Sequence, residues 1–187
     1  MSLPAFTTTE VLITGAGPTG LVLTCDLARC GIACRVVERE NPSFPGSRGS
    51  GLQPRTLEVF DDLGVIDAVR AAGGPIQRLQ SWDGSTRITE WDAVARAEPS
   101  PHLLPQWRTV EILQARHEEL GGSVEFDCEL TGIEQDADGV TARLRGPDGI
   151  ESAVRARYPV AADGGRSTIR KALRVGFPVT SSSPIRR

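Results

Sequence analysis

Lysine, long apolar runs and a strong charge of one sign are missing from this sequence. Lys171 is the only lysine among 21 basic residues, and the arginines are scattered along the chain. A formal net charge of −3 gives no broad positive field for nucleic acid or an anionic membrane. No stretch reaches the roughly 18 consecutive apolar residues of a membrane-spanning helix. We therefore expect neither nucleic acid nor a membrane as a partner.

A secretion signal and a metal-binding cysteine pattern are also missing. Residues 1–9 have neither a basic start nor an apolar core of the kind that directs export. The spacing of Cys25, Cys30, Cys34 and Cys128 fits no zinc pattern, and the two histidines lie far apart in the sequence. Reduced thiols are typical of the cytoplasm. We expect a cytoplasmic protein without a metal site, with one ordinary domain or slightly more in its 187 residues.

The order of apolar runs predicts an α/β fold. Residues 10–14 and 32–37 are typical of strands, and 18–29 of a helix between them, which makes a βαβ unit. Farther along the chain we expect a helix beginning at Pro54, two short strands around Asp83-Gly84, a linker over 97–105, a helix over 106–120, a three-stranded meander over 124–158, a short strand over 160–162 and a helix over 167–173.

A glycine motif, Gly15-Ala16-Gly17-Pro18-Thr19-Gly20, lies between the first predicted strand and helix. In such a motif the first glycine permits a tight turn, the second lets a diphosphate approach, and the third allows close contact between helix and strand. Glu38 ends the next strand and would accept hydrogen bonds from a ribose diol but repel a 2′-phosphate. The motif predicts FAD or NAD, not NADP; a glycine-rich turn without a ligand is the alternative.

Three further positions each allow two interpretations. Asp163, followed by two glycines and Arg166, could serve a ligand or cap a helix. Arg48, among glycines and serines, could reach phosphates or lie in solvent. Gln106 could meet hydroxyl groups of a ligand or begin a helix as its cap. From the residues alone, these alternatives stay open.

Together, the motifs resemble those of the FAD-dependent aromatic hydroxylases. These are single-component, class A flavoprotein monooxygenases of the p-hydroxybenzoate hydroxylase type, and the polyketide and phenol hydroxylases among them are the most similar. The resemblance covers about residues 9–177 and rests on the order of the segments Gly15–Leu21, Glu38-Arg39, Arg55–Phe60 with Leu63-Gly64, Gln106 with Glu111–Leu113, and Ala162–Ser167.

The resemblance implies a Rossmann-like FAD-binding domain, with a parallel sheet and a three-stranded β-meander, over residues 1–75 and 101–177. Residues 76–100 would begin the sheet of a substrate domain, and 178–187 would be a disordered tail. By the same resemblance, the cofactor-binding residues are Gly15, Gly17, Pro18, Thr19, Gly20, Glu38, Arg39, Arg48, Gln106, Asp163 and Gly164, with Arg166 and Arg170 placed to meet the nicotinamide nucleotide.

The activity that the resemblance implies is hydroxylation of an aromatic or polyketide small molecule. NADPH or NADH would reduce FAD, and dioxygen would then form a flavin C4a-hydroperoxide, so no protein side chain is expected to be catalytic. A homodimer is one expected assembly. Because the third FAD motif of the family is missing, we expect the 187-residue chain to be incomplete and poorly active alone. The alternatives are a non-catalytic dinucleotide-binding fragment or another flavoprotein of this fold, such as a polyprenyl reductase.

Overall fold

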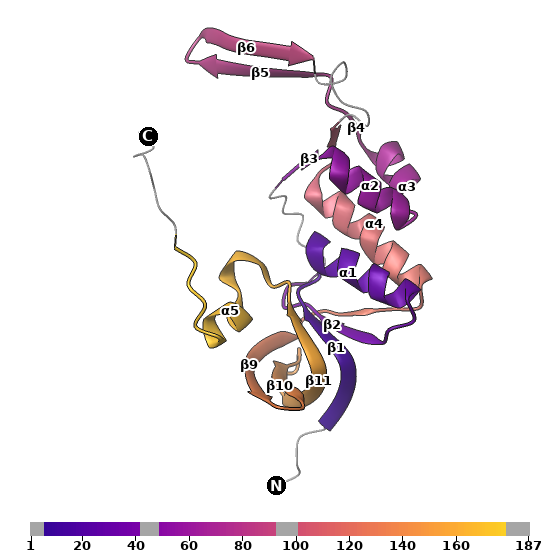
Figure 1. The fold of residues 1–187 in the computed structure, drawn as a ribbon, viewed down its shortest axis with the longest axis vertical. Helices are drawn as coiled ribbons and strands as arrows, with labels where there is room; N and C mark the ends of the chain where they lie inside the picture. Colours follow the sequence, from indigo (N-terminus) through magenta and orange to yellow (C-terminus); the bar gives the residue numbers. More distant parts are fainter. Residues whose placement is uncertain (1–5, 42–48, 93–100, 179–187) are drawn as a thin grey trace.

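A six-stranded mixed sheet carries the fold in the computed structural model, which describes residues 6–41, 49–92 and 101–178 (Figure 1). Its strand order is β8-β2-β1-β11-β10-β9. Four neighbouring strands run parallel: β8 (Val124–Glu125), β2 (Cys34–Val37), β1 (Phe6–Thr14) and β11 (Glu151–Ala161). The last two pair antiparallel: β10 (Gly139–Arg145) and β9 (Glu129–Asp136). The sheet therefore joins the predicted parallel part to the predicted meander.

The predicted βαβ unit is confirmed in β1, α1 (Pro18–Arg29) and β2. Pro18 begins the helix, where its fixed φ suits the first turn and its missing N–H costs no helical bond. Cys30 caps the other end, and Gly31 follows with a φ of 72° that a glycine adopts without strain. The local signals at both ends thus explain why the predicted helix boundaries hold.

The predicted strand over 160–162 is not a separate element, because β11 continues through it. β11 pairs with β10 up to Ala156 and with β1 up to Ala161. The N–H of Ala162 donates to the carbonyl of Thr14, so the N–H groups of every second residue of β11 point toward β1. Pro159 is at an alternate position, where an N–H would point away from β1. The strand continues through the proline because the pairing with β10 has already ended there.

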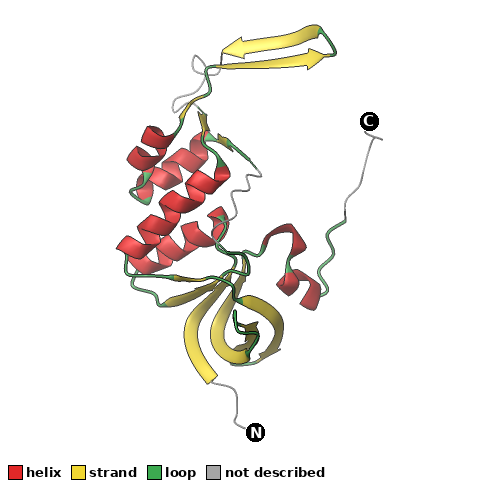
Figure 2. Ribbon diagram, turned by 180° about the vertical axis from the view of Figure 1, so that it is seen from behind, coloured by secondary structure: helices red, strands yellow, loops and turns green. Residues whose placement is uncertain are grey.

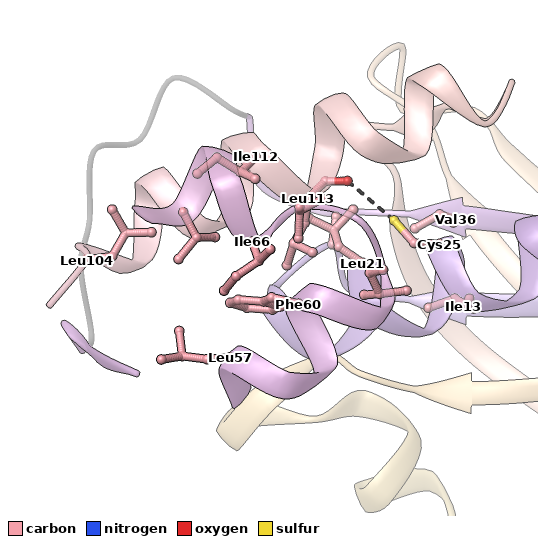
Figure 3. Close-up of a cluster of buried hydrophobic side chains, with 14 of the residues drawn as sticks. Ile13, Leu21, Cys25, Val36, Leu57, Phe60, Ile66, Leu104, Ile112 and Leu113 are labelled. Carbon is pink, nitrogen blue, oxygen red and sulfur yellow. Dashed lines mark hydrogen bonds between the residues drawn. The ribbon is translucent and has the colours of Figure 1, made fainter. Parts of the chain in front are cut away.

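Four helices lie on one side of the sheet, as seen from the front in Figure 1 and from behind in Figure 2. They are α1, α2 (Pro54–Asp62), α3 (Ile66–Ala72) and α4 (Gln106–Glu119). Of these, α1 lies against the strands, and α2 and α3 lie farther out. Their core includes Leu21, Phe60 and Leu113 (Figure 3). No helix was predicted at α3, because this helix spans only seven residues and has no side-chain cap. In α4, the buried side includes Thr109 and Ile112.

The other face of the sheet has a second core, beneath the curled meander and α5 (Thr168–Ala172). Adjacent strand residues point to opposite faces, so Ile13 belongs to the first core and Leu12 to the second. Ile169 of α5 packs into the second core, and α5 contacts β9. Thus the segment that follows β11 returns to the face opposite α1–α4.

A hairpin stands away from the rest (Figure 1). Its strands are β5 (Arg78–Asp83) and β6 (Thr86–Asp92), so the predicted turn at Asp83-Gly84 is confirmed. A small sheet at its base has β7 (His102–Leu103) between β3 (Gly51–Leu52) and β4 (Gly74–Pro75). The expectation of a plain linker over 97–105 was therefore wrong at β7. Residues 93–100 and the tail after Pro178 lie outside the described residues. Within the described ranges, no helix is long and apolar enough to cross a membrane.

Candidate functional site

The glycine motif forms the turn between β1 and α1, and two of its glycines are sterically required. Gly15 has a φ of 102°, and a β-carbon there would overlap the carbonyl oxygen of Ala162. A β-carbon at Gly20 would overlap the carbonyl oxygen of Gly15. Gly17, in contrast, has nothing within 4 Å of where its β-carbon would lie. The turn is thus packed tightly against the protein and open on the side where Gly17 lies.

The start of α1 leaves backbone donors for a ligand. The first helical hydrogen bond runs from the N–H of Leu21 to the carbonyl of Gly17, at 3.0 Å. The N–H groups of Thr19 and Gly20 therefore have no helical carbonyl to bond, and no side chain caps this end. Free N–H groups and the helix dipole favour an anion here.

Glu38 lies directly beside this turn, at the end of β2. Its Oε2 accepts from the N–H of Ala16 at 2.8 Å, and its Oε1 from the N–H of Glu40 at 2.9 Å. The neighbouring Arg39 is exposed and forms an ion pair with Glu40 at 3.0 Å. The carboxylate of Glu38 is thereby held in one orientation next to the expected diphosphate position.

Asp163 follows β11 and uses only one of its two carboxylate oxygens for the fold. Its Oδ2 accepts from the N–H groups of Thr168 at 2.6 Å and Ile169 at 3.4 Å, in the first turn of α5. Ser167 caps the same helix by accepting from the N–H of Arg170 at 3.0 Å. The Oδ1 of Asp163 is buried and has no partner among the described residues. A buried oxygen without a partner is costly, which favours a ligand donor at this position.

A cleft of about 1090 Å³ joins these features. That volume is at the upper end of the range typical of small-molecule sites. The predicted residues that line it are Gly15, Gly17, Pro18, Thr19, Glu38, Arg39, Gln106, Asp163, Gly164 and Arg166. Residues from β1, β2, α4 and the segment after β11, far apart in the sequence, therefore meet around one cavity.

Three predicted residues are not among those that line the cleft. Gly20 is buried in the packing of the turn. Arg170 donates to the carbonyl of Val175 at 3.2 Å, and its guanidinium lies 5.5 Å from the ring centre of Phe177. Arg48 lies outside the described residues. The structure thus brings Arg166, but not Arg170, to the cavity.

Sequence reasoning missed one wall of the cleft. The exposed side of α4 continues from Gln106 with lining residues that include Trp107, Val110 and Gln114. Helical spacing from Gln106 could have found them, because positions three and four apart share a face. Phe126, which also lines the cleft, follows the two-residue strand β8 and had no such signal.

Among the described residues, the cleft offers neither a metal centre nor an activated thiol. No group of three or more His, Cys, Asp or Glu side chains there could hold a metal ion. Cys128 lines the cavity, and burial raises the pKa of its thiol, so it stays protonated at neutral pH. The arrangement is suited to binding and orienting a ligand that brings its own chemistry.

Comparison with known proteins identifies the ligand class. Residues 8–186 match the FAD binding domain family. A flavin-dependent monooxygenase of Mycobacteroides abscessus is 46% identical over 178 residues, which are 89% of this chain and 37% of that protein. A 12-dehydrotetracycline 5-monooxygenase/anhydrotetracycline 6-monooxygenase of Streptomyces rimosus is 37% identical over 169 residues, 90% of this chain and 33% of that protein.

A solved structure agrees with this result. The flavin-dependent monooxygenase PieE, in complex with FAD and substrate, has a TM-score of 0.82 and 28% identity over 90% of this chain and 32% of its own. This chain thus spans about a third of the length of the relatives that it matches. The glycine turn, the acid at the end of β2 and the family match lead to one conclusion: the chain belongs to the FAD binding domain family.

Proposed function

We propose that this chain is the FAD-holding part of a flavin-dependent monooxygenase that hydroxylates an aromatic or polyketide small molecule, with NADH or NADPH as reductant and dioxygen as co-substrate. One observation carries the proposal. At a single cleft, the glycine turn, the carboxylate of Glu38 and the unpartnered oxygen of Asp163 come together. The relatives' names, which include tetracycline monooxygenases, support the substrate class.

The residues of the cleft fit FAD. The open side of the turn at Gly17 and the free N–H groups of α1 suit the diphosphate. Glu38 suits a ribose diol, because each of its oxygens holds one backbone donor and can accept another bond. The Oδ1 of Asp163 would accept from a hydroxyl of the flavin side chain, and Gln106, which also lines the cleft, would be a further polar group in this proposal. Bound FAD would supply the electron transfer and oxygen activation.

The division of the chain remains part of the proposal. Residues 1–75 and 101–177 would hold the cofactor, whereas 76–100 would begin the substrate domain. The separate two-stranded sheet of the β5–β6 hairpin supports this division. Cytoplasmic location and a homodimer are likewise proposals, the first of them supported by four unpaired cysteines.

A titration with FAD tests the proposal. The purified chain should quench or shift flavin fluorescence on binding, and mass analysis of the released ligand should identify FAD. In Gly17→Ala, a methyl group would occupy the open side of the turn, and FAD affinity should fall by about tenfold or more. Gly74→Ala is the matched control, since its β-carbon also meets nothing within 4 Å and Gly74 does not line the cleft. Absence of FAD binding by the unaltered chain would refute the proposal.

A further inference from the structure

The order of the strands gives the cleft a direction. The glycine turn follows β1, Glu38 follows β2, and Phe126 follows β8, in a sheet whose order is β8-β2-β1-β11. These strands are parallel, so their carboxyl ends lie along one edge, about 4.8 Å apart. If the proposed function holds, a dinucleotide across this edge has its diphosphate at β1 and its ribose at β2. The next group along the ligand, the base, then comes to the end of β8.

The loop after β8 is fixed to Glu38 from both sides. The N–H of Glu38 donates to the carbonyl of Glu125 at 2.8 Å, and the N–H of Cys128 donates to the carbonyl of Glu38 at 3.0 Å. Phe126 lies between these two contacts. It is half-buried and lines the cleft. Its backbone position is thereby set next to the acid proposed to bind ribose.

The polar side chains of this loop are already paired. Asp127 has a φ of 52°, and its Oδ2 accepts from Asn41 Nδ2 at 3.1 Å. Beside them, Cys128 and Leu130 line the cleft as buried apolar groups. A planar base would therefore meet one aromatic ring and two buried apolar groups here, although Arg39 and Glu40 also line this part of the cleft.

From this placement we infer that Phe126 is the base-binding residue of the cleft, and that its ring packs against the adenine of FAD. Bases stack on aromatic rings because each has a polarisable π face, whichever polar groups line its rim. Trp107, the other aromatic residue among those that line the cleft, belongs to α4 and follows Gln106 in the sequence. Of the two aromatic residues, only Phe126 follows a strand that pairs with β2, the strand that leads to Glu38.

The test compares the two halves of FAD as separate probes. ADP carries the adenosine and diphosphate, whereas FMN carries the flavin. Phe126→Leu keeps apolar bulk but removes the ring, and ADP and FAD affinity should each fall about fivefold. FMN affinity should stay within about twofold of the unaltered chain. Phe126→Tyr should restore ADP binding, because it keeps the ring. Trp82→Leu, on the exposed hairpin, is the matched control and should change none of these affinities.

The outcomes separate this inference from the proposed function. Unchanged ADP and FAD affinity in a folded Phe126→Leu protein would overturn the inference alone. An equal loss of ADP and FMN affinity would also overturn it, because that result indicates general damage to the cleft. An unaltered chain that binds neither FAD nor ADP would overturn both. Melting temperatures measured for every variant show whether a change in affinity reflects folding.

Discussion

At the scale of single residues, the candidate site depends on carboxylates with two tasks. Glu38 holds the backbone of the glycine turn through Ala16 and also faces the cleft. Asp163 holds the first turn of α5 and leaves one oxygen unpartnered. In each case the fold orients the side chain before any ligand arrives. Preorganisation of this kind lowers the cost of ordering the site on binding.

Replacing Glu38 tests the ribose assignment. Glu38→Ala should weaken FAD binding by about 1.5–3 kcal/mol, the usual worth of hydrogen bonds to a charged group. Glu38→Gln keeps one acceptor oxygen and should lose less. Fluorescence titration measures both variants. The matched control is Glu134→Gln, which removes an exposed charge on β9 that pairs with Arg143 of β10, and it should leave FAD affinity unaltered. Full affinity in Glu38→Ala would show that the ribose is bound elsewhere.

A buried histidine, His117 on α4, should make stability depend on pH. Burial lowers its pKa, and this effect is larger than the opposite effects of the hydrogen bond to Ser123 and the charge of Glu118, which raise the pKa. The folded state therefore binds a proton less readily than the unfolded state, whose histidine has a pKa of about 6.5. The neutral ring's contribution to the free energy of unfolding is fully present above that pH. It is lost as the pH falls toward the lower pKa that His117 has in the folded state.

The measurement is the free energy of unfolding by urea between pH 7.5 and pH 5. His117→Phe keeps a ring next to Gly122, where space is limiting, and should flatten this pH dependence. The pH dependence of His117→Phe is compared with that of the unaltered chain. An unchanged slope in the variant would contradict the assignment.

At the scale of elements, the short helix α5 has two caps with different consequences. Both Ser167 and Asp163 satisfy N–H groups of its first turn, but only Asp163 lines the cleft. The loss of such a cap costs about 1 kcal/mol of stability. Both Asp163→Ala and Ser167→Ala should therefore lower the melting temperature. Only Asp163→Ala should also weaken FAD binding, as titration at a temperature where both variants are folded would show. Equal FAD affinity in the two variants would leave Asp163 a cap and nothing more.

The elements also show how far the sequence could be read. The first βαβ unit and its glycine turn were predictable because their signals are local, such as Pro18 at a helix start. The continuity of β11 was not, since it depends on β1, whose paired residues are about 146 positions away in sequence. Local and long-range signals also explain why Gln106 was predicted to line the site and Phe126 was not. The position of Phe126 follows from contacts between β8 and β2, and no periodic pattern precedes it.

At the scale of the whole molecule, the exposed hairpin affects whether the proposed hydroxylation can take place in this chain alone. The hairpin has exposed apolar side chains, including Trp82 at 56% and Ile88 at 62% exposed. Oxygen transfer to a substrate needs a site from which water is excluded. A two-stranded sheet standing in solvent does not enclose such a site.

We therefore expect the 187-residue chain, given FAD, NADPH and a simple phenol, to form hydrogen peroxide at most. The assay follows NADPH oxidation, peroxide and hydroxylated product in parallel. A reaction with FAD but without the protein gives the background rate. Hydroxylated product in a stoichiometric ratio to NADPH would contradict the expectation and would indicate a pocket assembled in some other way, such as between two copies.

The long gap between β1 and β11 has a consequence for synthesis on the ribosome. The side chain of Thr14 donates to the carbonyl of Val160, 146 residues later. During synthesis, β1 therefore lacks its neighbour β11 until those residues have been added. At translation rates of about 5–20 residues per second, that wait lasts roughly 7–30 s. Until then, β1 can pair only with β2, and its other edge stays open to any extended chain nearby. A chaperone that shields the nascent N-terminal strand should therefore raise the yield of folded protein more than one added after release.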